Sequence, residues 1–550
     1  MKRLISMFLA AAMLCAAALP VRAQEPTEGE TNQNSAAEIE APQAAELEPA
    51  ELETAEFEPE EETAELETAE LKTADVSGYP SITLAGGSHA LYLDEHGPNK
   101  AVVYNPQAVP GIVKEYIPGI VKAILKFDYN GVVDLIVEAL HRIFGDIAMD
   151  ENGESITEGI TCDRQTFKKS NINSDQIFFG FDWRLDPMEN AEKLHDFVAY
   201  IRARRKGIEK FNFVGTSGSG GVMLAYMKLY GYDDIASLVM NISLHNGLEM
   251  FGALATGNVS LGAEALGKIE IDLSAMGLDW QLQPWLRLLY ESGLFSIISK
   301  TTKSGIRPWV RPTYDRGVIP ALFMMPGYWS FVPPEDYEAA KAYIFREDPE
   351  KYAGLIKKLD RYHDEVAEQA DELILEANKR FKVAVRSGYG KPSWPLGDDT
   401  GVQGDGMVET VRSSIGATGA PLDEPFLFFY EQKIDDGHDH ISPDRYIDAS
   451  TCLLPEQTWF TYNLSHKWEI SYSGWYEWWL AAENPTVFDN EEFPQFSEML
   501  EPGVYVPREA APQSKVLSVL KAGGLGILKA WRWVLQLPLF WVKWWYQSYV

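Results

Sequence analysis

Three side chains that lie far apart in the sequence are of the types that transfer acyl groups by nucleophilic catalysis. Ser217 lies in a turn of small residues, Asp405 follows a later apolar segment, and His466 comes near the end of the same region. A serine becomes a strong nucleophile when a histidine takes its proton and a carboxylate orients that histidine. The order serine, acid, histidine is one in which this chemistry occurs. Ser217, Asp405 and His466 are therefore candidates for a catalytic triad.

The stretch 210–227 predicts a strand, a sharp turn and a helix in direct succession. Residues 211–214 are mostly apolar, a glycine-dense turn follows, and apolar residues then resume. A serine at the tip of such a turn is the nucleophile elbow of α/β-hydrolases, which needs small residues two positions before and after the serine. Gly215 and Ser219 fill these positions around Ser217. Two alternatives stay open: Ser219 as the nucleophile, and a glycine-rich turn that binds phosphate or nothing.

Two backbone N–H groups are candidates for an oxyanion hole. The first is that of Gly218, at the start of the helix behind Ser217, where the helix dipole also favours negative charge. The second is near Gly87, because an apolar strand at 79–84 leads into the pair Gly86 and Gly87. Paired glycines let the backbone approach a substrate closely.

Other residues compete for the roles of acid and base. Asp398 and Asp399 precede Asp405, but their neighbourhood is typical of a solvated turn. His438 and His440 lie in an acidic loop that suggests either a metal site or, more commonly, a polar turn. We predict no metal and no cofactor.

The surrounding pattern predicts alternating strands and helices. The buried-strand pattern at 176–185 is followed by Asp186, Pro187 and Glu189, which together are typical of a helix start. A strand, a helix, the strand before Ser217 and another helix then form the βαβα order of a parallel sheet. Further strands are predicted at 240–244 and 381–385, a strand-like segment at 451–454, and two helices within 112–144.

Two motifs resemble the lecithin:cholesterol acyltransferase family. The run 181–190, F-D-W-R-L-D-P-M-E-N, is similar to the Y-D-W-R of that family, and 404–408, G-D-G-M-V, is similar to its G-D-G-T-V except at Met407. The resemblance covers about 79–479. It implies an α/β-hydrolase fold, with a mostly parallel central sheet, helices on both faces and a helical cap inserted at about 247–375 over an acyl pocket. It also implies a lipid O-acyltransferase or (phospho)lipase acting on phospholipid or sterol-type esters, with Asp405 as the acid.

The chain divides into four parts by composition. Residues 1–23 have the charged start and apolar run of a secretory signal peptide, and 24–76 form an acidic low-complexity linker with seventeen Glu, one Asp and one Lys. Residues 77–500 are the predicted hydrolase domain, and 501–550 form a tail with a Trp-rich amphipathic helix. The expected location is secreted or extracytoplasmic, with association at a membrane surface.

Charge and composition limit the classes of molecule that the protein is expected to bind. The formal net charge is -33, and no basic stripe offers a surface to nucleic acid. Tryptophan and lysine together in 516–550 favour peripheral contact with a membrane, and a terminal helix docked on the core is the alternative. Cys162 and Cys452 either form a disulfide or are buried thiols. Two other functions stay open: an inactive hydrolase-fold binding protein at the cell surface, and an esterase of small soluble substrates.

Overall fold

The computed structural model describes most of the predicted hydrolase region. The described residues are 78–84, 90–93, 101–126, 128–162, 172–258, 311–392, 402–422, 424–464, 466, 474–501 and 504–510. The predicted signal peptide 1–23, the acidic linker 24–76 and the segment 516–550 lie outside them. Within the described part, no helix combines the length and the apolar character needed to cross a membrane.

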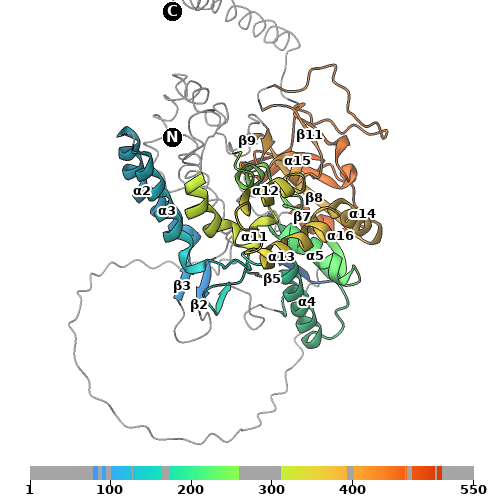
Figure 1. Cartoon of the computed structure of the whole chain (residues 1–550). Coiled ribbons are helices and arrows are strands. Elements are labelled where there is room, and N and C mark those ends of the chain that lie inside the picture. Colours follow the sequence, from blue (N-terminus) through green and yellow to red (C-terminus); the bar gives the residue numbers. More distant parts are fainter. Residues whose placement is uncertain are drawn as a thin grey trace, which may run out of the picture.

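An eight-stranded sheet forms the centre of the fold (Figure 1). Its strand order is β15-β14-β13-β8-β7-β6-β1-β5. Every neighbouring pair is parallel except β14 with β15. The protein is therefore an α/β protein with a mixed, mostly parallel sheet. The strands are β1 (Ser81–Leu84), β5 (Gln176–Phe179), β6 (Phe211–Thr216), β7 (Ile235–Asn241), β8 (Lys382–Tyr389), β13 (Thr458–Tyr462), β14 (Phe496–Glu501) and β15 (Val504–Pro507).

Helices cover both faces of this sheet, so its central strands β6, β7 and β8 are buried almost throughout. On one face, Phe213, Leu238 and Val383 join the main core together with α4 (Pro187–Arg204) and α5 (Ser219–Tyr230). On the other face, the tryptophans of α16 (Gly474–Ala481) pack on Val214 and Val239. Successive strand residues thus enter different cores.

The remaining α-helices of the described residues lie between β1 and β5, between β7 and β8, or after β8. They are α2 (Val109–Leu125), α3 (Tyr129–Phe144), α6 (Glu249–Ala255), α11 (Pro326–Trp329), α12 (Tyr337–Ile344), α13 (Ala353–Tyr362), α14 (Ala370–Arg380) and α15 (Thr410–Ser413), the last following β8. A π-helical segment, η4 (Tyr314–Phe323), precedes α11. Three smaller sheets comprise β2 (Leu91–Leu93), β3 (Ala101–Tyr104), β4 (Ile160–Cys162), β9 (Lys391–Pro392), β10 (Gln403–Gly404), β11 (Thr418–Gly419) and β12 (Ile447–Asp448).

Local signals in the sequence located several elements well. The predicted start of α4 is confirmed: the Asp186 carboxylate accepts the N–H of Met188 at 2.8 Å, and Pro187 is the first helical residue. The pair of helices within 112–144 is also confirmed, as α2 and α3. The Glu189 carboxylate binds Lys358 at 2.9 Å.

Three predictions of strands need correction. The strand expected at 240–244 is β7, which ends at Asn241 because Ile242 has a left-handed φ of 42°. The strand expected at 176–185 ends at Phe179. The segment 451–454 is no strand: a 3-10 turn at Ala449–Thr451 precedes it, and Asp448 caps that turn through the Ser450 N–H.

The cysteines lie apart in the fold. Cys162 ends β4, and Cys452 follows the 3-10 turn after β12. Both side chains are buried, and the structure does not join them by a disulfide. Burial raises the pKa of the Cys452 thiol to about 12.

Candidate active site

Ser217 lies at the tip of a turn between β6 and α5. Its φ is 53°, a conformation that is costly for a residue with a side chain. Backbone hydrogen bonds hold it there: its N–H donates to Asn241 O, and its carbonyl accepts from Gly220 and Leu244. The strain is thus stored where the chain changes from strand to helix, as the sequence predicts for an elbow.

The small residues of the turn are required by close packing. A Cβ on Gly215 would come within 2.1 Å of the Met223 Cε and 2.9 Å of the Ser219 Oγ. A Cβ on Gly220 would lie 2.5 Å from the carbonyl oxygen of Leu244. A side chain at Gly220 would therefore clash with fixed backbone after β7, whereas one at Gly215 would require the flexible Met223 side chain of α5 to move.

The structure brings Ser217, His466 and Asp405 together. The Ser217 Oγ lies 2.8 Å from the His466 Nε2, and the His466 Nδ1 lies 2.7 Å from the Asp405 Oδ2. All three side chains are buried. They follow β6, β8 and β13, which are near neighbours in the sheet, and the carboxyl ends of parallel strands meet at one edge.

Backbone groups orient the Asp405 carboxylate. Its Oδ1 accepts the N–H of Met407 at 2.9 Å and that of Val408 at 2.8 Å, while its carbonyl accepts the His466 N–H at 3.1 Å. The Oδ2 is thereby left for the imidazole. Because Met407 binds through its N–H, the departure from G-D-G-T-V at this position leaves the hydrogen bonds of the acid intact.

The structure separates the two candidate serines. The Ser219 side chain is fully buried, and its hydroxyl donates to the Thr216 carbonyl at 2.8 Å. Ser217 is the serine that contacts His466. Ser219, the unusual fifth residue of the elbow, therefore has a structural role through its hydrogen bond to Thr216.

The two other histidines named from the sequence, His438 and His440, are not part of the group formed by Ser217, His466 and Asp405. His440 is buried between the Asp436 carboxylate at 2.9 Å and the side-chain amide oxygen of Gln495 at 3.0 Å, and His438 stacks on Phe488. No set of three metal-ligating side chains comes together within the described ranges. Asp398, Asp399 and Gly87 lie outside the described residues.

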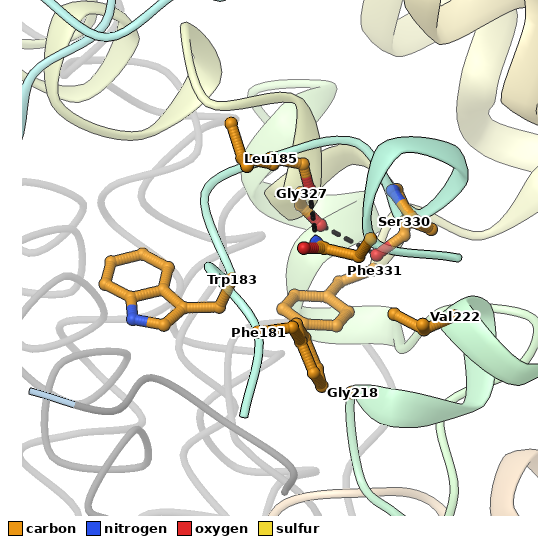
Figure 2. A pocket seen from close by; sticks show the side chains of 10 residues that line it. Phe181, Trp183, Leu185, Gly218, Val222, Gly327, Ser330 and Phe331 are labelled. Carbon is orange, nitrogen blue, oxygen red and sulfur yellow. Dashed lines mark hydrogen bonds between the residues drawn. The ribbon is translucent and has the colours of Figure 1, made fainter. Parts of the chain in front are cut away.

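A small pocket of about 20 Å³ adjoins the elbow at Gly218 (Figure 2). It has room for about one water molecule. Its lining is mainly apolar and comes from the segment after β5, from the start of α4, from α5 with the residue before it, and from α11 with the residues after it: Phe181, Trp183, Leu185, Pro187, Asn190, Gly218, Val222, Gly327, Ser330 and Phe331. The α5 N-terminus, with the Gly218 N–H predicted for the oxyanion, therefore faces an apolar environment.

The D-W-R motif builds a wall of this pocket. The Arg184 guanidinium is fully buried and binds both oxygens of Asp182, through Nε at 3.0 Å and Nη2 at 2.7 Å. Its Nη1 donates to the Ile147 carbonyl at 3.0 Å. The Arg184 carbonyl in turn accepts the N–H of Gly327, which attaches α11 to the motif. The motif is thus a structural anchor that places Trp183 in the pocket wall.

A group of buried polar residues next to the site was not found from the sequence. Burial raises the pKa of Glu409 to about 7 and lowers that of His245 to about 4. The Arg412 guanidinium binds Glu249 and Glu335 and donates to the Asn246 carbonyl. Glu409 comes four residues after Asp405, but nothing in its sequence neighbourhood indicates that it is buried.

A scan of protein-family models and a search of curated proteins found no match to this chain. The resemblance to a family therefore rests on the sequence motifs, and the structure supports an α/β architecture for the chain.

Proposed function

We propose that the chain is a serine hydrolase or O-acyltransferase that acts on lipid esters through an acyl-enzyme. The observation that carries the proposal is the chain of hydrogen bonds from Ser217 through His466 to Asp405, with Ser217 in the left-handed conformation of an elbow. The order of parallel strands beside it supports an α/β-hydrolase fold. The two motifs support a relationship to the lecithin:cholesterol acyltransferase family.

The reaction would follow from this geometry. With its Nδ1–H donated to Asp405, the His466 imidazole has a lone pair on Nε2 that accepts the Ser217 proton. The Ser217 Oγ attacks the acyl carbonyl, and the Gly218 N–H stabilises the oxyanion. His466 then gives its proton to the leaving alcohol as the acyl–oxygen bond breaks. Water or a second alcohol releases the acyl group by the same steps in reverse.

A fluorophosphonate probe tests the proposal, because only an activated serine displaces its fluoride. We expect labelling of the wild type, none of S217A and undiminished labelling of S219A, since the Ser219 hydroxyl is bound to Thr216 O. No labelling of a folded wild-type protein would refute the proposal and favour the inactive binding protein.

The alternative candidate is an esterase of small soluble substrates. The pocket at Gly218 does not separate the two candidates, because at about 20 Å³ it holds neither a long acyl chain nor a small ester as it stands. Rates on one ester above and below its critical micelle concentration separate the two functions. A lipid-directed enzyme gains activity with micelles, whereas a soluble esterase does not.

A further inference from the structure

A loop between β11 and β12 presents three consecutive large apolar side chains to solvent. Leu427, Phe428 and Phe429 are 56%, 75% and 65% exposed, and Ile434 nearby is 53% exposed. The loop projects from the body beyond β11 (Figure 1). Apolar groups of this size, gathered at one loop tip, are a typical mark of an interaction surface. We call residues 424–439 the apolar loop.

The apolar loop is held in shape from behind by one arginine. The Arg445 guanidinium donates to the carbonyls of Phe426, Leu427 and Tyr430, at 3.1, 2.6 and 3.1 Å. The rings of Phe426 and Tyr430 stack at 4.0 Å, and the Tyr430 hydroxyl donates to the buried Asp448 at 2.7 Å. The polar backbone thus turns inward onto fixed partners while the apolar side chains turn outward. Such a loop loses little conformational entropy when it docks.

Both limbs of the apolar loop are rooted beside the candidate active site. Gln403, two residues before Asp405, donates to the Ala420 carbonyl at 3.0 Å at the start of one limb. On the other limb, the buried Asp444 accepts from the hydroxyl of Tyr389, the last residue of β8, at 3.1 Å. The loop therefore starts and ends at the same edge of the sheet as the Ser217 group.

The charge around the apolar side chains restricts the partner. Four exposed carboxylates stand in the loop, against one exposed lysine, Lys433. They are Glu424, Glu431, Asp435 and Asp439, and a fifth carboxylate, on the Asp436 side chain, is partly buried and bound to His440. An anionic surface would be repelled by them. A zwitterionic phospholipid surface presents its ammonium groups outermost, which carboxylates and aromatic rings both attract, while its acyl region accepts apolar side chains.

From these observations, we propose that the apolar loop docks the protein on a zwitterionic phospholipid surface, with Leu427, Phe428 and Phe429 inserted below the headgroups. The choice of lipid as partner rests on the proposed function. Because the flanks of the loop contact the end of β8 and the segment before Asp405, docking would bring the Ser217 edge of the sheet toward the lipid.

A fluorescent probe in the loop tests this directly. The full-length S217A/C15S protein, which leaves lipids intact, carries F428C labelled with a thiol-reactive NBD dye, and the two other native cysteines, Cys162 and Cys452, are buried. We expect a blue shift and a gain in NBD intensity on phosphatidylcholine vesicles, and a smaller response on phosphatidylglycerol vesicles. I156C is the matched control, because Ile156 is 65% exposed on another segment, and its dye should not respond. The probe reads the loop alone, whatever other segments do.

Binding measurements give the second test. F428S/F429S should weaken binding to phosphatidylcholine vesicles by on the order of 100-fold. E431K/D435K should strengthen binding to phosphatidylglycerol vesicles. The inference would be overturned if the NBD dye did not respond to vesicles, or if the protein bound phosphatidylglycerol as well as phosphatidylcholine. It would also be overturned if the NBD dye responded to protein concentration without lipid, which would make the partner a second copy of the chain.

Failure of this inference is distinguishable from failure of the proposed function. Fluorophosphonate labelling of Ser217 without any NBD response on vesicles would remove the loop's role and leave the enzyme. An NBD response in a protein whose wild type resists fluorophosphonate would support the loop and remove the enzyme.

Discussion

The raised pKa of Glu409, a buried carboxyl four residues after Asp405, can be tested by measuring how the free energy of unfolding depends on pH. Glu409 is fully buried, and its Oε2 lies 3.5 Å from the N–H of Glu249, while its Oε1 has no partner in the described part of the chain. Arg412 is bound to Glu249 and Glu335. Burial therefore raises the pKa of Glu409 from 4.5 to about 7.

The sign of the effect follows from that direction. The folded-state pKa of Glu409 is above its unfolded value, so its contribution to stability is complete below pH 4.5 and is lost as the pH rises through 7. The loss amounts to on the order of 3 kcal/mol. Glutamine imitates the neutral acid in shape but cannot ionise. We expect E409Q to match the wild type near pH 4.5 and to exceed its free energy of unfolding by that amount at pH 8.

Urea unfolding followed by tryptophan fluorescence measures both proteins at each pH. The difference between wild type and E409Q cancels the titration of all other groups. If the free energies of unfolding of wild type and E409Q changed in parallel from pH 5 to 8, burial would not raise the pKa of Glu409, and the prediction would be wrong. Glu376, which is half-buried and paired with Arg380, provides a control: its pKa is lowered, so the difference between E376Q and wild type should not grow with pH in this range.

Three further predictions concern the site and its support. D405N should lower kcat on the order of 10³-fold or more with little change in KM, because the His466 imidazole loses the carboxylate that orients it. An unchanged kcat in steady-state assays would contradict Asp405 as the acid. G327A should cost about 3 kcal/mol in urea unfolding, since its Cβ would lie 2.0 Å from the Trp183 carbonyl, whereas G111A, with open space, should not destabilise; equal effects would refute the packing argument. Native Cys452 should resist iodoacetamide at pH 8 and react only after unfolding, as its raised pKa implies; mass spectrometry shows which.

Features set by neighbouring residues were predictable from the sequence. The cap at Asp186 and the elbow around Ser217 depend on side chains within a few positions, so composition and spacing reveal them. The grouping of Ser217 with Asp405 and His466 was anticipated from chain order together with the resemblance, and the structure brings the three within hydrogen-bonding distance.

Features set by distant contacts were not predictable. Glu409 is buried because α6 folds against it from 160 residues away, and no local pattern encodes that contact. The segment after Thr451 is apolar enough to suggest a strand, but the Asp448 carboxylate takes the Ser450 N–H and turns the chain there. The hydrogen bonds of Arg184 to Ile147 and Ser155 likewise join segments that only the fold brings together.

The adjacency of β7 and β8 has a consequence for how this architecture changes over time. The two strands pair directly, although everything from Ile242 to Phe381 stands between them in the chain. The entropic cost of closing a loop grows only slowly with its length. The inserted stretch is therefore free to lengthen, shorten or exchange helices while the strands beneath it keep their pairing. Under the function proposed above, substrate preference would then diversify in that stretch without redesign of Ser217, Asp405 and His466.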